Sequence, residues 1–210
     1  MQDFNQALLI FFDFMLTLKQ NFFSEKTLIV ARKLLGKKII HKCSNRLLSG
    51  IIVETEAYAG SIDTACHTYK GKTARNSVMF GPAGIAYVYF IYGMHYMLNI
   101  VTEGENSGCA VLLRAIIPVQ GKKQMENLRG KKGKDLTNGP AKLCQAMAID
   151  KAFNGLALTP ENRLWLENYK TIPNRCICTG PRIGINYATQ KDQKAPWRFW
   201  VKNDWQLGLA

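Results

Sequence analysis

Residues 51–58 read Ile-Ile-Val-Glu-Thr-Glu-Ala-Tyr, and this stretch decides the fold. Its β-branched residues predict a strand rather than a helix. Side chains alternate along a strand, so Glu54, Glu56 and Tyr58 share one face and the odd-numbered residues share the other. The sequence therefore predicts a strand that presents two carboxylates and a tyrosine on a single face.

Two further stretches have strand character, and helices are expected before and after them. The strand-like runs are residues 84–92, Gly-Ile-Ala-Tyr-Val-Tyr-Phe-Ile-Tyr, and residues 109–116, Cys-Ala-Val-Leu-Leu-Arg-Ala-Ile. We expect one helix to begin at Ser24, whose hydroxyl would cap it, and to end at Gly36. A second helix is expected to begin at Pro140. This order of elements predicts a single α+β domain around an antiparallel or mixed sheet.

The composition is that of a folded protein with a strongly basic surface. With 210 residues, 47% apolar and 20% charged, the chain can build one domain with a hydrophobic core and differs from disordered or fibrous proteins. Lys and Arg number 28 against 15 Asp and Glu, which gives a formal net charge of +13. Such an excess indicates a polyanionic partner, either nucleic acid or an acidic membrane surface.

The cysteines and the first residues bear on location. The six cysteines form no Cys-x-x-Cys pair, which argues against a zinc site, and scattered reduced thiols are typical of a cytoplasmic protein. Residues 7–18 are mostly apolar, but they lack the features of a signal peptide and are too short to span a bilayer. We interpret residues 1–20 as an N-terminal helical extension and residues 21–210 as the main domain, and we expect no membrane partner.

Glu56 is the first candidate for a catalytic group. One interpretation places Glu54 and Glu56 on a solvated face without a chemical role. Arg114 favours another interpretation, because it interrupts the apolar run 109–116, where an unpaired guanidinium is costly. If the two strands are neighbours, Arg114 can pair with Glu56 and keep it ionised. A carboxylate held in this way can orient and deprotonate a water molecule.

Aromatic side chains are dense between residues 58 and 92, where they include Tyr58, His67, Tyr87, Tyr89 and Tyr92. A single tyrosine in a strand usually belongs to the core. Here Tyr87 and Tyr89 share one face, and Tyr92 ends its strand beside a glycine, where a turn would present it outward. Facing aromatic rings make a slot for a flat heterocycle, and an aromatic side chain at a turn can wedge into a base stack. Together with the positive charge, the pattern is typical of a protein that extrudes a base from duplex DNA.

Basic residues are concentrated in residues 121–142, which contain seven Lys and Arg against two acids. The backbone amides that open the Pro140 helix, with Lys142 nearby, are a candidate phosphate site. Most of the other lysines are expected to add nonspecific, salt-sensitive binding. Cys66 and His67 are adjacent, but the sequence does not give them the geometry of a catalytic pair.

Several of these segments, in this order, resemble the alkyladenine (3-methyladenine) DNA glycosylase family. The matching stretches are Glu54-Thr55-Glu56-Ala57-Tyr58, Asp63 with His67, Arg75-Asn76, Met79-Phe80, Tyr87-Val88-Tyr89 with Tyr92-Gly93, Asn99, Val111-Leu112-Leu113-Arg114-Ala115, Asn138-Gly139-Pro140-Ala141-Lys142-Leu143-Cys144 and Pro181-Arg182-Ile183-Gly184-Ile185. The likeness extends over about residues 22–202. A series of motifs with this spacing is far more specific than any one of them.

The resemblance implies a single mixed α/β domain around a curved, largely antiparallel sheet with flanking helices, residues 21–210 being the DNA glycosylase domain. It implies a monofunctional repair enzyme that flips an alkylated purine out of duplex DNA and hydrolyses the N-glycosidic bond, leaving an abasic site. No metal, cofactor or lyase lysine is expected. Double-stranded DNA with damaged bases is the expected partner of a monomeric enzyme in the cytoplasm, associated with the nucleoid if the source is bacterial.

The same resemblance implies roles for individual residues. Glu56 would be the general base that activates water for attack at the sugar C1′, and Arg114 would help to place both. The remaining residues would contact DNA. Tyr58, His67 and Tyr89 would enclose the flipped base, and Asn99 would line the pocket floor, where it could obstruct the guanine 2-amino group. Tyr92 would fill the gap left in the duplex, and the residues expected at phosphates are Lys72, Arg75, Lys142 and Arg182. A cationic alkylated base leaves readily and stacks well on electron-rich rings, so one carboxylate suffices, whereas no acid is evident that would protonate a neutral lesion.

Two other functions stay open at this point. A noncatalytic nucleic-acid-binding module, for RNA as well as DNA, would explain the charge and the aromatic residues but would leave Glu56 and Arg114 without a role. A different transferase or hydrolase on a similar scaffold, such as a formyltransferase-like domain, is the other alternative. Release of a base from methylated duplex DNA would discriminate among the three.

Overall fold

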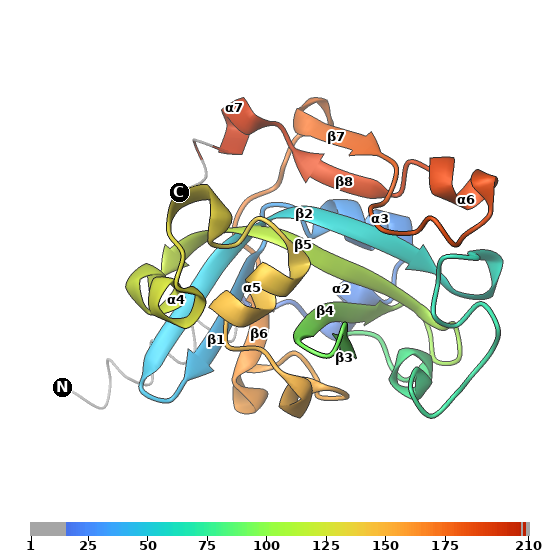
Figure 1. Ribbon diagram of the computed structural model, residues 1–210, viewed down its shortest axis with the longest axis horizontal. Coiled ribbons are helices and arrows are strands. Elements are labelled where there is room, and N and C mark those ends of the chain that lie inside the picture. The colour runs from blue at the N-terminus through green and yellow to red at the C-terminus, as the bar shows by residue number, and fades with distance from the viewer. Residues whose placement is uncertain (1–15, 207, 209–210) are drawn as a thin grey trace.

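A computed structural model describes residues 16–206 and 208 of the protein. Its centre is a curled sheet of eight strands, in which β3, β4, β5, β2, β1 and β6 are neighbours in that order (Figure 1). Strand β8 pairs with β2 and with β7, and every pairing between the named strands is antiparallel. The strands are β1 Lys38–Cys43, β2 Arg46–Ala59, β3 Ala86–Ile91, β4 His95–Thr102, β5 Cys109–Gln120, β6 Leu164–Glu167, β7 Ile177–Gly180 and β8 Arg198–Val201. The predicted α+β fold with a curved, largely antiparallel sheet is confirmed.

Helices flank the sheet, with α5 in front of it and α3 behind it in the view of Figure 1. The α-helices are α2 Gln20–Phe23, α3 Thr27–Lys33, α4 Lys122–Arg129, α5 Pro140–Ala146, α6 Gln190–Lys194 and α7 Asn203–Gln206. Helix α3 packs on β2, and α5 packs on β4 and β5. Leu34, Ile51, Leu98 and Leu113 are fully buried in this core. Burial of these apolar side chains fixes the sheet, and with it the strand that carries the two glutamates.

Strand β2 is long enough to serve several partners, and it contains the run 51–58. Its first half pairs with β1, its second half with β8, and its other edge with β5. The register between β2 and β5 shifts on both sides of Glu54. Such a β-bulge bends a strand and re-aims its side chains, and bulges are frequent next to active sites. Glu56 therefore lies two residues beyond Glu54, where the pairing with β5 is irregular, and a further register shift lies between Ser49 and Gly50.

The first helix begins later than the sequence indicates. Ser24 does not cap α3, because it follows α2 and its hydroxyl donates to the carbonyl oxygen of Gln20. The start of α3 is held instead by Glu103, whose carboxylate accepts hydrogen bonds from the backbone N–H and the hydroxyl of Thr27 at 3.0 and 2.8 Å. Gly36 follows the helix with φ +83°, and a Cβ there would lie 2.7 Å from the carbonyl oxygen of Lys170. This position therefore requires glycine.

The expected N-terminal helical extension falls largely on residues 1–15, which lie outside the described residues. Thr17, near its end, forms an isolated antiparallel bridge with Glu167. Within the described part of the chain, no helix has both the length and the apolar character needed to cross a membrane. The other expected elements lie close to the predicted positions: the runs 84–92 and 109–116 contain β3 and the first part of β5, and α5 begins at Pro140.

Candidate active site

Glu56 lies on β2 and is completely buried, with 0% of its surface exposed. Its Oε1 accepts a hydrogen bond from the backbone N–H of Ile183 at 2.7 Å, and its Oε2 accepts one from the hydroxyl of Tyr58 at 2.9 Å. Burial raises the pKa of the Glu56 carboxyl, while the charge of Arg114 and these two donors lower it in part. A carboxylate with a raised pKa is a stronger base than an ordinary surface glutamate. Oε2 accepts one protein hydrogen bond and keeps a lone pair for a water molecule.

Arg114 reaches Glu56 from the neighbouring strand. Strands β2 and β5 pair so that Thr55 lies opposite Leu113, and the Arg114 guanidinium approaches Glu56 Oε1 at 3.2 Å. The predicted ion pair is thus confirmed, and the interpretation of Glu56 as a solvated surface residue is wrong. Glu54 lies on the same face and accepts hydrogen bonds from Arg114 Nε and from an Arg198 terminal nitrogen, each at 3.0 Å. Two carboxylates and two guanidiniums therefore neutralise one another around this point of β2.

A narrow cavity opens beside this ion-pair cluster, and its lining is mainly aromatic. It is lined by Tyr58, Ala65, Cys66, His67, Met79, Tyr87, Tyr89, Asn99 and Tyr187. The structure thus brings together all four residues that were expected around a base, namely Tyr58, His67, Tyr89 and Asn99. We call this cavity the aromatic pocket. Because the Tyr58 hydroxyl contacts the Glu56 carboxylate, Glu56, the candidate general base, lies at the margin of the pocket.

The rings of His67, Tyr87 and Tyr89 pack on one another to form one wall. The His67 and Tyr89 ring centroids are 4.6 Å apart and nearly perpendicular, those of Tyr87 and Tyr89 are 5.5 Å apart, and His67 Nδ1 lies 3.0 Å from the Tyr87 hydroxyl. Asn99 is buried next to this wall and donates to the carbonyl oxygen of Tyr87 at 3.2 Å. These contacts fix the orientation of each ring before any ligand enters.

The same wall is electrically neutral near pH 7. Shielding from water lowers the pKa of His67, and the positive charge of Arg75 lowers it further. Burial raises the pKa of Tyr87 to about 12 and that of Tyr89 still higher. Neutral, electron-rich rings accept a flat cation without charge repulsion.

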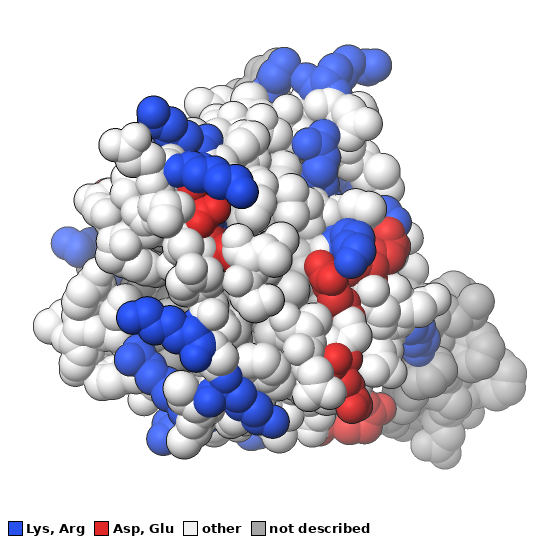
Figure 2. Space-filling model, turned by 90° about the vertical axis from the view of Figure 1, so that its right-hand side faces the viewer, with Lys and Arg blue, Asp and Glu red and all other residues white. Residues whose placement is uncertain are grey.

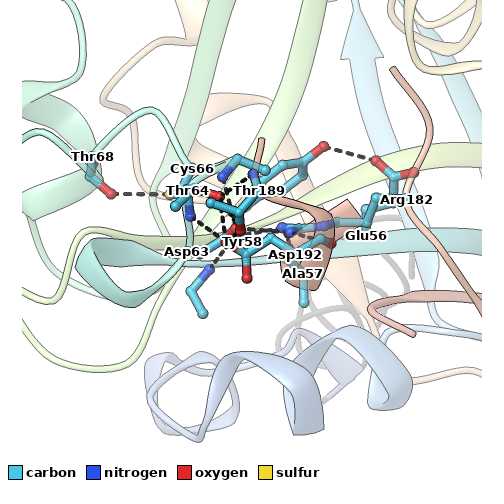
Figure 3. A network of polar contacts seen from close by, with 12 residues as sticks. Glu56, Ala57, Tyr58, Asp63, Thr64, Cys66, Thr68, Arg182, Thr189 and Asp192 are labelled. Carbon is cyan, nitrogen blue, oxygen red and sulfur yellow. Dashed lines mark hydrogen bonds and ion pairs between the residues drawn. The ribbon is translucent and has the colours of Figure 1, made fainter. Parts of the chain in front are cut away.

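Arg182 departs from its expected role. Its guanidinium is buried, makes a bidentate ion pair with Asp63 and donates to the carbonyl oxygen of Ala57 (Figure 3). It also lies between the rings of Tyr58 and Trp197, 4.8 and 4.9 Å from their centroids. A DNA phosphate cannot reach a side chain in this position, so the expected phosphate contact is corrected to a supporting role beneath Tyr58.

The carboxylate of Asp192, like that of Asp63, joins residues 59–65 to residues 181–192. Asp192 accepts hydrogen bonds from the backbone N–H and hydroxyl of Thr64 and from the hydroxyl of Thr189 (Figure 3). Asp63 belongs to the segment after β2, and it accepts hydrogen bonds from the backbone N–H groups of Ala59 and Ala65. Together the two aspartates clamp residues 59–65 against residues 181–192.

Tyr92 lies at the tip of the hairpin that joins β3 to β4. It is 79% exposed and has a left-handed backbone with φ +54°, a conformation that is uncommon for a residue with a side chain. Gly93 follows with φ +68°, and Met94 is 67% exposed. The turn expected beside Gly93 is confirmed, and it presents a large aromatic side chain to solvent.

The three remaining basic residues lie at different places. Lys72 and Arg75 are exposed in the segment before the 3₁₀-helix Ser77–Phe80. The charge of Arg75 lowers the pKa values of His67, Tyr87 and Tyr89, which line the pocket. Lys142 is on α5, where its ammonium group contacts Asp135 at 3.0 Å and Asn138 at 2.8 Å. Figure 2 looks onto the end of the molecule that carries helix α6 and the loop after β2. Most of the acidic side chains visible on this face lie in the right-hand half of the view.

Sequence reasoning missed some of the site. Tyr187 lines the pocket and the Ile183 N–H holds Glu56, but neither was assigned a role. The motif at residues 181–185 was the available signal for Ile183, whereas nothing in the sequence singles out Tyr187. Among residues 16–206 and 208, no group of three His, Cys, Asp or Glu side chains is arranged to hold a metal ion.

Comparisons with known proteins identify the family of the chain. The profile of the family described as Methylpurine-DNA glycosylase (MPG) matches residues 21–205. A protein of Methanocella arvoryzae is 46% identical over 188 residues, which cover 89% of this chain and 92% of the relative. Proteins of Alkaliphilus oremlandii and Carboxydothermus hydrogenoformans are 45% and 46% identical, covering 89% of this chain and 96% of each relative. All three are named "Putative 3-methyladenine DNA glycosylase". The chain belongs to the methylpurine-DNA glycosylase family.

Proposed function

We propose that this DNA glycosylase removes 3-methyladenine and related alkylated purines from duplex DNA by hydrolysis of the N-glycosidic bond. The observation that carries the proposal is a fully buried carboxylate, Glu56, paired with Arg114 at the margin of the aromatic pocket. Membership of the family and the names of the relatives support a repair enzyme that acts on alkylated bases. A base in a duplex is shielded by its neighbours, so it must be flipped out of the stack to enter such a pocket.

In the proposed reaction Glu56 is the general base. A water molecule hydrogen-bonded to Glu56 Oε2 attacks the sugar C1′ and transfers a proton to the carboxylate. The bond from C1′ to the purine nitrogen breaks, and its electron pair leaves with the base. Arg114 and the Ile183 N–H hold Oε1, so the carboxylate cannot rotate away from the attacking water. An abasic sugar and a free base remain.

The chemistry of the pocket lining suits a cationic, flat leaving group. An alkylated purine that carries a positive charge leaves as a neutral base and needs no proton from the enzyme. The neutral wall of His67, Tyr87 and Tyr89 would stack on it, with Tyr58 as a further ring and Asn99 placed to obstruct a guanine 2-amino group. No acidic side chain, Asp or Glu, lines the pocket in the described part of the chain. We therefore propose that cationic lesions are better substrates than neutral ones.

The DNA would be held outside the pocket. We propose that Tyr92 fills the gap left by the flipped nucleotide, since it is exposed at a hairpin tip. Lys72 and Arg75 would contact phosphates near the pocket mouth, and Lys142 would do so after exchanging Asp135 for a phosphate. No lysine lines the pocket among the described residues, which supports a monofunctional enzyme without lyase activity.

We further propose a monomer that works in the cytoplasm, on the nucleoid if the source is bacterial. All six cysteines are free, as is usual for proteins in a reducing compartment. Size-exclusion chromatography with light scattering would test the oligomeric state of the full chain.

An abasic-site assay on methylated duplex DNA tests the proposed function. Glu56→Gln keeps the size of the side chain and removes its basicity, so we expect unchanged binding to lesion duplexes and a loss of base release of about 10²–10⁴-fold. Glu105→Gln, an exposed carboxylate in the loop between β4 and β5, is the matched control and should release base at the wild-type rate. Full activity of Glu56→Gln would remove the assigned base. Binding without base release by the wild type would favour the noncatalytic module instead.

A further inference from the structure

Glu54 is the second carboxylate beside the aromatic pocket's margin, two residues before Glu56 on β2. A single oxygen of its side chain, Oε1, accepts a hydrogen bond from Arg114 Nε and another from an Arg198 terminal nitrogen, each at 3.0 Å. The side chain of Glu54 is 20% exposed, whereas Glu56 is 0% exposed. Glu54 therefore joins two guanidiniums next to the buried candidate base while it keeps contact with water.

The orientation of Arg114 depends on its side-chain contacts. The register of β2 with β5 passes over Arg114, because its two neighbours in the chain lie opposite Glu54 and Thr55. At such an irregularity the regular alternation of the strand no longer aims the side chain. The guanidinium contacts Glu54 through Nε and Glu56 through a terminal nitrogen at 3.2 Å, so one planar group bridges the two carboxylates. The contact with Glu54 thus helps to fix the direction from which the guanidinium approaches Glu56.

Arg198 connects Glu54 with the backbone donor that holds Glu56. Besides its contact with Glu54, Arg198 donates from Nε to the carbonyl oxygen of Pro181 at 2.8 Å. Pro181 lies two residues before Ile183, whose N–H donates to Glu56 Oε1 at 2.7 Å. Glu54 is therefore linked to both supports of Oε1, directly to the guanidinium on β5 and through Arg198 to the segment that carries the N–H group.

We propose that Glu54 is a positioning residue for the general base: it orients Arg114 towards Glu56 and offsets part of the guanidinium charge that Glu56 experiences. By Coulomb's law, a negative charge beside Arg114 weakens the attraction between the guanidinium and the Glu56 carboxylate. Glu56 is thereby held in place and still remains basic enough to take a proton from water. This inference rests on the proposed function and adds a residue on which the same reaction depends.

The surroundings of Glu56 predict how the reaction responds to a change at Glu54. Burial raises the pKa of the Glu56 carboxyl, the charge of Arg114 and two hydrogen bonds lower it, and the negative charge of Glu54 raises it again. Other ionisable groups near Glu56 are tyrosines with raised pKa values, which stay neutral, and arginines, which stay cationic. They are Tyr58, Tyr89, Tyr187, Arg182 and Arg198. Removal of the Glu54 charge should therefore lower the pKa of Glu56.

Single-turnover base release from a methylated duplex, at saturating enzyme and from about pH 5 to pH 9, tests the inference. Glu54→Gln keeps an oxygen that accepts from both guanidiniums and removes the charge. We expect the acid limb of its profile to lie at lower pH than that of the wild type, so the ratio of variant to wild-type rate is highest at acid pH and falls as the pH rises. At alkaline pH the variant should be slower by less than about 10-fold, because a weaker base takes the proton less readily.

Two further variants complete the test. Glu54→Ala removes the acceptor as well as the charge, so Arg114 loses its orientation and the alkaline plateau should fall by about 10- to 100-fold. Glu25→Gln removes a carboxylate that pairs with Lys33, away from the pocket lining, and is the matched control that should reproduce the wild-type profile. Ionisation of His67 is common to all of these proteins and cancels in the ratio.

The outcomes separate the inference from the proposed function. If the wild type is active, a Glu54→Gln profile that matches it, falls by one factor at every pH or moves to higher pH overturns the role of Glu54 and leaves the proposed function intact. A wild-type plateau in Glu54→Ala overturns that role too. If the melting temperature shows that Glu54→Ala does not fold, the profile of Glu54→Gln decides alone. Absence of base release by the wild type overturns both.

Discussion

Replacing Tyr58 by Phe removes one hydroxyl group and leaves the aromatic ring in place. That hydroxyl donates to Glu56 Oε2 at 2.9 Å, and the Glu56 carboxylate that it contacts is 0% exposed. The hydroxyl stabilises the ionised carboxylate, and for this reason it lowers the pKa that burial has raised. Its removal therefore raises the pKa of Glu56 further, and less of the enzyme carries the ionised base at a given pH.

The size of the effect follows from the hydrogen bond. A bond to a charged group contributes about 1.5–3 kcal/mol. At about 1.36 kcal/mol per factor of ten, this corresponds to a decrease in base release of roughly 10- to 160-fold wherever Glu56 is mainly protonated. At pH values above the pKa of the variant the carboxylate is ionised in both proteins, and the two rates should converge. The defect of Tyr58→Phe is thus expected to be largest at acid pH and to disappear as the pH rises.

The assay is single-turnover base release from a methylated duplex between about pH 5 and pH 9, the range in which an elevated carboxyl pKa is visible. Tyr69→Phe, which removes the hydroxyl of a half-exposed tyrosine, is the control. A profile of Tyr58→Phe that falls to the same extent at every pH would show that the hydroxyl positions Glu56 without affecting its ionisation. A profile identical to that of the wild type would refute the contact as a functional one.

Three further predictions concern the Asp63–Arg182 ion pair, Tyr92 in the hairpin between β3 and β4, and the basic segment 121–142. Asp63→Asn leaves the buried Arg182 guanidinium without its carboxylate, so the free energy of unfolding measured in urea should fall by about 3–5 kcal/mol, and the double variant with Arg182→Met should recover part of the loss. Tyr92→Ala should weaken binding to lesion duplexes, measured by fluorescence anisotropy, without lowering the melting temperature, because the side chain is 79% exposed; unchanged affinity would contradict the wedge. Lys132 is an exposed lysine of the basic segment 121–142, so Lys132→Ala should weaken binding to lesion and plain duplexes alike and reduce the slope of log K against log salt by about 0.9. An effect confined to lesion DNA would contradict a phosphate contact of Lys132.

The sequence predicts the parts of the fold that depend on local patterns. The run 51–58 indicates β2 because its β-branched residues favour a strand whatever surrounds them, and Pro140 marks the start of α5 because proline fits the first turn of a helix. Ser24 misleads for the opposite reason: the donors at the start of α3 are satisfied by Glu103, a residue 76 positions away. A cap of this kind depends on tertiary contacts that no local pattern contains.

The residues of the candidate site divide in the same way, into those that a local pattern predicts and those whose position depends on tertiary contacts. Alternation along β2 predicts that Glu54, Glu56 and Tyr58 share a face, and the cost of an unpaired guanidinium predicts that Arg114 needs a carboxylate partner. The burial of Arg182 was missed because its partner Asp63 lies 119 residues earlier in the chain, so the pair exists only after the two segments meet. A basic residue in a basic protein favours a surface role until its partner is known.

In the proposed function, the charges of the site would allow one carboxylate to be sufficient for hydrolysis. Arg114 and Arg198 balance Glu54 and Glu56, Arg182 balances Asp63, and the wall formed by His67, Tyr87 and Tyr89 is neutral. In the proposed reaction the positive charge therefore belongs to the substrate. As the glycosidic bond of an alkylated purine breaks, that charge moves from the base to the sugar, which acquires oxocarbenium character. In the proposed reaction this movement would bring positive charge towards Glu56, so the carboxylate proposed to activate water would also stabilise the transition state more than the ground state. A neutral purine begins without that charge, and the same arrangement would have to create it before the bond could break.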